Sequence, residues 1–412
     1  MAVGTPLSPD VDFDPFSPAY LSDPYAHFPP LRDRPPFYAA SLDMWIVSRF
    51  ADVDAVFRDP ARFSAAITQD PLTPLSPEAR AVLADGFRPL KVMSNLDPPD
   101  HARIRAHTTR AFSARRTALL EPVIRARTTA LIDAFTGEDE VDIVRALTFP
   151  LPAITIFTMI GFPDDDLERL KAWCGERLVM TWGRPSVDDQ VRIARQMVDY
   201  WNYCKAFVAR RDAERADDFT SDLLRTADED GSLSREEIAS IIYALSFAGH
   251  ETTTNLLANT LRRVLESPGT WGTLRAEPAL IGNTVEEGLR HDTSVVTWRR
   301  GAREAAAVGG VEVPAGAKLL LLLASANHDP QRFPEPERFD PRRGNARAHI
   351  AFGMGIHYCL GAALARMQVA IVLELMTERF PHARILEQPY AFSPNISFRG
   401  PAALRLALGS HA

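Results

Sequence analysis

Apolar residues recur every three or four positions over residues 100–264, which is the spacing of one face of an α-helix. Prolines at 150, 163 and 185 divide this region into several helices. Residues 38–50 alternate instead and predict strands, with helical spacing following at 52–57. The pattern therefore predicts a small β region followed by a mainly helical middle.

One long helix can be placed at both of its ends. Ser234 followed by Glu237 has the pattern of a capping box, and Pro268 with Gly269 supplies a stop. These signals predict a helix over residues 235–267, close to 50 Å long at about 1.5 Å per residue. A helix of that length crosses the molecule and must have a mostly buried middle.

Strand chemistry returns after a further predicted helix at 281–290. Glycines and valines between 309 and 316 are typical of turns and strands, residues 329–347 lack clear periodicity, and helix resumes at 361–380. We predict a single domain over residues 1–412, mainly α with smaller β-sheets (α+β). Its β-rich parts are expected at about 36–60, 295–325 and 383–410, and its helix-rich parts at about 100–290 and 361–380.

Composition narrows the class of protein. A chain of 412 residues with 46% hydrophobic residues buries more than one core usually holds, so either two domains or one large domain around an internal group is expected. The net charge of -7 argues against a nucleic-acid partner. We find neither a signal peptide nor a membrane span, and the three cysteines fit no disulfide framework, so a soluble, cytoplasmic protein is expected.

Cys359 lies in a glycine-rich loop, Phe352 to Gly361, immediately before a predicted helix. A helix N-terminus lowers the pKa of a thiol, which favours a thiolate metal ligand. Gly353 and Gly355 allow backbone amides to approach the sulfur. A buried inert thiol is one alternative, and a zinc site using Cys359, His357 and His349 is another, although zinc normally takes four ligands.

This loop resembles the signature of the cytochrome P450 haem-thiolate monooxygenases, continued here by Leu364, Ala365 and Arg366. The resemblance implies the P450 fold, with the long helix crossing over a buried haem b. It implies Cys359 as the iron ligand, Phe352 as a haem contact and His357 as a donor to a haem propionate. His101, Arg105 and Arg300 match further propionate contacts, although Arg299 is an alternative to Arg300.

The middle of the long helix carries residues that are unusual for a helix centre. Glycine costs about 1 kcal/mol there, and threonine hydroxyls compete for backbone carbonyls. The resemblance implies that Glu251 and Thr252 are the catalytic acid-alcohol pair, that Ala248 and Gly249 lie against the haem, and that a local helix distortion leaves room for oxygen and water. Without it, these residues form a polar helix face.

Two further sets follow from the resemblance. Glu287 and Arg290 share a helix face and would form a buried pair completed by Arg338, which holds the cysteine loop. The substrate pocket is expected along a loop at residues 68–90, along residues 178–184, and at Ala244, Leu245, Ala248, Val295, Val296, Asn395 and Ile396, with Arg88, Trp182 and Asn395 as polar anchors.

The predicted reaction is insertion of one oxygen atom from O2 into a small, largely apolar organic substrate, by hydroxylation or epoxidation. The alternatives are oxidative coupling or cyclisation, peroxide-driven oxidation and a non-catalytic haem protein. No nucleotide-binding motif is found, so electrons are expected from a separate ferredoxin or flavodoxin. A docking face for this donor is one interpretation of Arg103, Arg110, Arg115, Arg116, Arg342, Arg343 and Arg347, and ordinary solvated arginines are the other.

Overall fold

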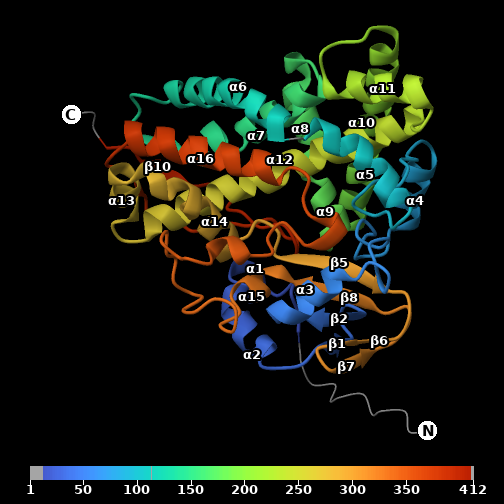
Figure 1. Cartoon of the computed structure of the whole chain (residues 1–412), viewed down its shortest axis with the longest axis horizontal. Helices are drawn as coiled ribbons and strands as arrows, with labels where there is room; N and C mark the ends of the chain where they lie inside the picture. Colours follow the sequence, from blue (N-terminus) through green and yellow to red (C-terminus); the bar gives the residue numbers. More distant parts are fainter. Residues whose placement is uncertain (1–12, 113, 410–412) are drawn as a thin grey trace.

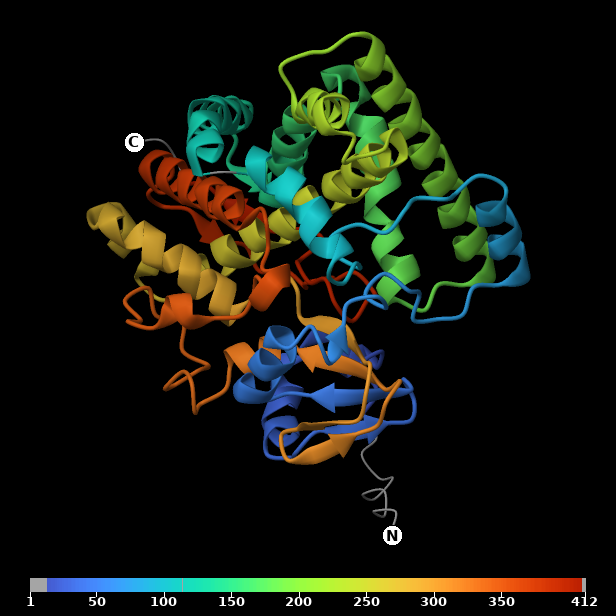
Figure 2. The same ribbon diagram turned by 45° about the vertical axis from the view of Figure 1, so that its right-hand side comes forward.

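The computed structural model describes residues 13–112 and 114–409. A helical part lies above a smaller β-rich part in both views (Figures 1 and 2). Within the described residues, no helix combines the length and apolar character needed to cross a membrane. The mainly α architecture with small sheets confirms the predicted fold class.

The largest sheet has the order β1-β2-β8-β5-β3. Strands β2 and β8 run parallel and the other neighbours are antiparallel. A second sheet has the order β4-β10-β9, and β6 pairs with β7. The strands are β1 (Phe37–Ala39), β2 (Met44–Val47), β3 (Phe63–Ser64), β4 (Glu140–Asp142), β5 (Thr297–Ala302), β6 (Ala306–Val308), β7 (Val311–Val313), β8 (Lys318–Leu322), β9 (Arg384–Ile385) and β10 (Arg405–Ala407).

The α-helices occupy the positions that periodicity predicts, with some additions. They are α1 (Pro18–Ser22), α2 (Phe28–Arg32), α3 (Phe50–Arg58), α4 (Pro77–Ala84), α5 (Asp100–Ala111), α6 (Ala114–Asp133), α7 (Pro150–Ile160), α8 (Leu167–Gly175), α9 (Arg177–Trp182), α10 (Val187–Ala213), α11 (Phe219–Asp230), α12 (Arg235–Glu266), α13 (Thr270–Ala276), α14 (Ile281–His291), α15 (Leu323–Asn327) and α16 (Ala362–Arg379).

Helix α12 organises the interior. Its predicted capping box is present, with Ser234 and Glu237 bonded reciprocally, and at about 1.5 Å per residue its 32 residues span about 48 Å. The first half contributes to one apolar cluster with α7, α8 and α10, and the second half to another with α6, α14 and α16. The polar residues of α12 lie between these two clusters, so the predicted site falls at their junction.

Two local predictions were wrong. Residues 77–84 form α4, although residues 68–90 were predicted as loop; Ser76 caps this helix and Pro77 begins it, a start signal that is visible in the sequence. Helix α12 is continuous through Gly249 and Thr252, so the predicted distortion is absent. The hydroxyls of Thr252 and Thr253 donate to carbonyls four residues earlier without interrupting the helix.

Candidate active site

The cysteine loop is folded by its own backbone. The amide of Cys359 donates to the carbonyl of Phe352 at 2.9 Å, which closes the loop just before α16. Gly353 and Gly355 both have φ of 68°, in the left-handed region that favours glycine. A Cβ on Gly355 would lie 2.7 Å from the carbonyl oxygen of Phe57, so this position requires glycine for close packing on α3.

Cys359 is exposed on the cysteine loop. Desolvation by the surrounding protein raises the pKa of its thiol, against a hydrogen bond from the backbone of Gly361 and the charges of Arg105 and Arg366. Coordination to a metal cation deprotonates a thiol directly, so a metal would supply what the protein environment does not.

Four cationic or donor side chains gather beside the loop. The rings of His101 and His357 lie 4.3 Å apart between centroids, and both Nε2 atoms are buried without a hydrogen-bond partner. Arg300 is buried, and within the described part of the chain its guanidinium donates to the carbonyl of Arg299. Burial, followed by the charge of Arg300, lowers the pKa of His357 to about 3. Arg105 donates to the carbonyl of Tyr358.

These residues fit the haem that the resemblance implies. Buried polar atoms normally have partners, yet here, among the described residues, two imidazole nitrogens lie without one beside a buried arginine that has no carboxylate. Two carboxylates, such as haem propionates, would satisfy His101, Arg300 and His357 together, with Cys359 on the adjoining loop as the iron ligand. The ring of Phe352 stacks under the guanidinium of Arg366, at 4.6 Å from the ring centroid. That contact links Phe352 to α16, so the ring helps to hold the cysteine loop against this helix.

The zinc alternative is not supported within the described residues, since no group of three or more potential ligands is found there. His349 lies 3.1 Å from a carboxylate oxygen of Glu286, and His357 bonds the carbonyl of Met93. The two histidines therefore have other partners.

On α12, Glu251 is held by the residue that precedes it. The Nε2 atom of His250 lies 3.0 Å from Oε1 of Glu251, and both side chains turn toward α8, where Lys171 and Cys174 lie. Although burial disfavours a charged imidazole, Glu251 and Cys174 raise the pKa of His250 to about 10. Burial opposes the ionised form of Glu251 too, but His250 and Lys171 lower its pKa. The pair is therefore an ionic couple.

Gly249 has a different role from the predicted one. A Cβ at this position would lie 2.6 Å from Cγ1 of Ile156, so glycine lets α7 approach α12 closely. Ala248, one residue earlier, is exposed in a helix whose neighbouring turns are buried. Thr252 donates to the carbonyl of Ala248 at 2.9 Å. The open face of α12 is therefore the one that carries Ala248 and Thr252. A Cβ on Gly249 would point away from that face, toward α7.

The pair Glu287–Arg290 is fully buried and bidentate, with distances of 2.8 and 2.9 Å. The predicted third member, Arg338, is wrong. Its side chain is 63% exposed and lies near Glu335 and Asp340, and only its carbonyl accepts a bond from Arg290. Arg343 takes the place instead, with Nε 3.1 Å from both oxygens of Glu287, and its amide donates to the carbonyl of Asp340, which closes a turn between the two arginines.

Sequence reasoning also missed a second acid beside this pair. Glu286 bonds Arg366 of α16 at 2.8 Å and His349 at 3.1 Å, which ties α14 directly to the cysteine loop and its helix. Its neighbours hold the pKa of Glu286 at about 2 despite burial. The sequence did single out Arg366 as part of the loop motif. Spacing along the chain, however, does not reveal that Glu286 is the acid that Arg366 binds.

The predicted pocket residues come together only in part. The backbone of Val296 bonds Ser397, Val295 bridges to Phe398, and Gly183 bridges to Asn395, so the end of α9, β5 and the C-terminal loop form one wall. Ala244 and Leu245 pack into the adjoining core. Asn395 is not a free polar anchor, because its amide bonds its own loop at Ser397 and Phe398. Ile396 is buried, and Arg88 is exposed.

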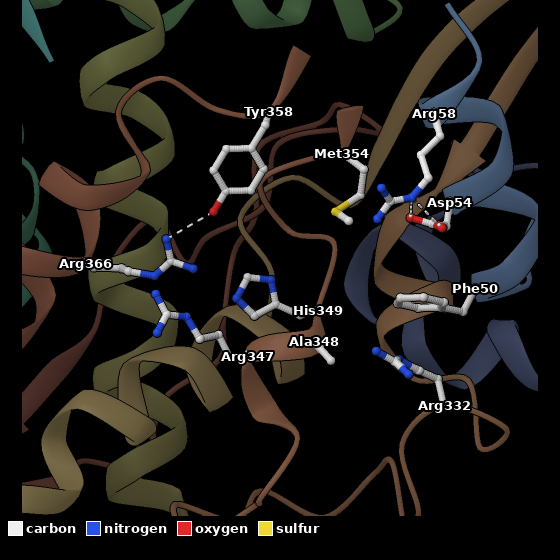
Figure 3. Close-up of a pocket in the computed structure, with 10 residues that line it drawn as sticks. All are labelled: Phe50, Asp54, Arg58, Arg332, Arg347, Ala348, His349, Met354, Tyr358 and Arg366. Carbon is white, nitrogen blue, oxygen red and sulfur yellow. Dashed lines mark hydrogen bonds and ion pairs between the residues drawn. The ribbon is translucent and has the colours of Figure 1, made fainter. Parts of the chain in front are cut away.

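The predicted docking arginines are largely engaged elsewhere. Arg103 pairs with Glu237, Arg116 with Asp222 and Arg342 with Glu277, while Arg343 is buried. The side chains of Arg110 and Arg115 lie outside the described residues. Arg347 is 82% exposed and borders a pocket of about 410 Å³ beside the cysteine loop (Figure 3). That pocket is lined by Phe50, Asp54, Arg58, Arg332, Arg347, Ala348, His349, Met354, Tyr358 and Arg366.

Comparison with known proteins identifies the family. The sequence profile described as cytochrome P450 matches residues 191–391. Cytochrome P450 107B1 of Saccharopolyspora erythraea is 34% identical over 91% of this chain and 92% of its own length. The cytochrome P450 monooxygenase PikC of Streptomyces venezuelae is 34% identical over 97% and 95%. The solved cytochrome P450 CREJ, in complex with (4-ethylphenyl) dihydrogen phosphate, is 37% identical with a TM-score of 0.93 over 96% of this chain and 99% of that one. This chain belongs to the cytochrome P450 family of monooxygenases.

Proposed function

We propose that this P450 binds haem b and hydroxylates or epoxidises a small, largely apolar organic compound. The observation that carries the proposal is the pair of unpaired Nε2 atoms of His101 and His357, which lie with the buried Arg300 beside the loop of Cys359. The haem supplies the activation of O2, which a cysteine-ligated iron favours. The protein's residues supply binding, orientation and protons.

Thr252 and Glu251 divide the proton transfer between them. Thr252 presents its hydroxyl on the open face of α12 beside Ala248, where it holds a proton for the oxygen site. Glu251 exchanges protons with solvent from its position between His250 and Lys171. Because His250 holds the carboxylate toward α8, Glu251 must turn away from this contact to deliver a proton.

The substrate class follows from the wall and from one relative. The wall of α9, β5 and the C-terminal loop is mostly apolar, as ligand sites usually are. CREJ was solved with an aryl phosphate, so a small aromatic compound that carries an anionic group is the candidate class for this chain.

Electrons come from a separate ferredoxin or flavodoxin that docks beside the cysteine loop. The pocket there combines four arginines with the exposed Tyr358 (Figure 3). A basic concave surface favours encounter with an acidic donor. Replacing Arg332 and Arg347 by glutamate is expected to slow reduction by an acidic ferredoxin at low salt, and the difference should shrink at high salt. An equal rate in the variant would reject this docking site.

The experiment that tests the proposed reaction uses Thr252→Ala in the haem-loaded enzyme, with a ligand that shifts the ferric haem to high spin. The variant is expected to consume reductant but to release hydrogen peroxide in place of product. Thr253→Ala is the matched control, because Thr253 makes the same kind of bond to the carbonyl of Gly249 and is buried. Unchanged coupling in Thr252→Ala would remove this residue from proton transfer.

A further inference from the structure

Two successive arginines on β5 share an unusual property. Arg299 and Arg300 are both 2% exposed, and neither has a carboxylate within 4 Å among the described residues. Other buried arginines differ, since Arg290 and Arg343 meet Glu287 and Arg262 meets Asp292. Arg299 and Arg300 both donate to backbone carbonyls instead. A buried charge without an opposite charge is costly, so both positions favour an anion from outside the chain.

The haem accounts for only one of them. Arg300 faces His101 and His357, whereas the next residue along a strand points to the opposite face. Arg299 accordingly stacks on Trp182 at 3.9 Å and donates to the carbonyls of Thr68 at 3.0 Å and Thr181 at 3.5 Å. Its Nε is buried without a partner. Burial lowers the pKa of Arg299 to about 10, with only Asp70 opposing.

A second arginine converges on the same segment from α9. Arg177 lies within 3.4 Å of the side-chain oxygen of Gln69, next to Thr68, and it also has no carboxylate within 4 Å among the described residues. Its guanidinium lies over the rings of Tyr243 and Phe247 in α12. Phe247 directly precedes Ala248 on the open face. Two cations thus flank residues 68–69 at the edge of the proposed substrate wall.

We propose that Arg299 and Arg177 bind the phosphate group of a phosphate-monoester substrate, whose apolar part extends toward Ala248. A phosphate monoester carries about -1.5 to -2 charges near neutral pH, which matches two guanidinium groups, and guanidinium binds phosphate through paired hydrogen bonds. The inference rests on the proposed monooxygenase function and names its substrate class.

The test uses the haem-loaded protein and three probes: phenyl phosphate, phenol and inorganic phosphate. Binding is measured by calorimetry and by the ferric spin shift. We expect phenyl phosphate to bind at least about tenfold more tightly than either phenol or inorganic phosphate, with an affinity that falls as salt rises. Benzoate, with one charge, is expected to bind more weakly than phenyl phosphate.

The variant Arg299→Gln is expected to lose about tenfold in affinity for phenyl phosphate while phenol stays within about twofold. Arg177→Gln should show a smaller loss, and Arg299→Lys should retain part of the affinity. Arg169→Gln is the matched control, because Arg169 is half exposed, pairs with Asp166 at 2.6 Å and, like Arg299, lies over a tryptophan ring. This control should bind phenyl phosphate as the wild type does.

Several outcomes would overturn the proposal. Equal binding of phenyl phosphate and phenol would reject an anion site, and equal losses for both probes in Arg299→Gln would make this arginine a support of the loops. Inorganic phosphate that binds as tightly as phenyl phosphate would indicate a separate ion site. Any of these results in a protein that shows the carbon monoxide spectrum of a thiolate-ligated haem leaves the monooxygenase assignment standing.

Discussion

Buried charges on the two sides of the cysteine loop differ in whether the protein itself supplies the opposite charge. On the α14 side, Glu286 and Glu287 are each bonded to two or more basic side chains of the protein itself. On the β5 side, Arg299 and Arg300 are buried without an acid. The first arrangement holds a scaffold together, while the second is complete only with a ligand. Charge satisfied internally therefore marks structure, and charge left unsatisfied marks a binding site.

The largest expected effect is on the scaffold side. Glu287→Ala leaves Arg290 and Arg343 buried without their carboxylate, which should cost about 3–5 kcal/mol in the free energy of unfolding. Urea denaturation followed by circular dichroism measures this loss. Arg338→Ala is the control, because that side chain is mostly exposed and its removal should change stability by less than about 0.5 kcal/mol. Equal effects in both variants would contradict the assignment of Arg343 as the third member.

The β5 side should respond in the opposite manner. Arg300→Met removes a buried charge without an internal partner, so the stability of the apoprotein should fall by less than about 1 kcal/mol or rise. Haem binding should weaken by about 2 kcal/mol, because a charge-assisted contact to a propionate is lost. Denaturation of the apoprotein measures its stability, and the rate of haem transfer to an acceptor apoprotein measures the strength of haem binding. A large loss of apoprotein stability with unchanged haem transfer would reverse the comparison.

The smallest expected effect on stability concerns His250. Its charge is paired with Glu251 inside the protein, although Glu251 belongs to the proposed proton-transfer residues. The folded-state pKa of His250 is raised to about 10, so its contribution is complete below about pH 6.5 and is lost as pH rises through 10. The pKa of Glu251 is lowered, so its contribution is present above about pH 4.5 and is lost in acid. His250→Gln should therefore cost about 1 kcal/mol between pH 5 and 6.5 and almost nothing above pH 10.

Denaturation of the wild type and His250→Gln across that pH range gives this difference. His382→Gln, at an exposed position, serves as the control. A stability difference that stays constant up to pH 11 would show that packing, and not the ion pair with Glu251, explains the effect.

Sequence reasoning performed best where local signals decide the structure. The capping box at Ser234 and the stop at Pro268 placed α12 within one residue at its C-terminus, and glycine spacing located the cysteine loop. It failed where the partner comes from a distant turn. Arg338 and Arg343 are indistinguishable by spacing, and only the turn from Asp340 to Arg343 brings Arg343 to Glu287. Likewise, no pattern shows that Gly249 faces Ile156 or that Asn395 bonds its own loop.

The central claim is that Cys359 ligates a haem iron as a thiolate. Its most direct measurement is the absorption spectrum of the reduced, haem-loaded protein with carbon monoxide. We predict the strongly red-shifted Soret band of a thiolate-ligated haem in the wild type and its loss in Cys359→Ala. A wild-type protein that binds haem but lacks this band, or a Cys359→Ala variant that keeps it, would contradict the account.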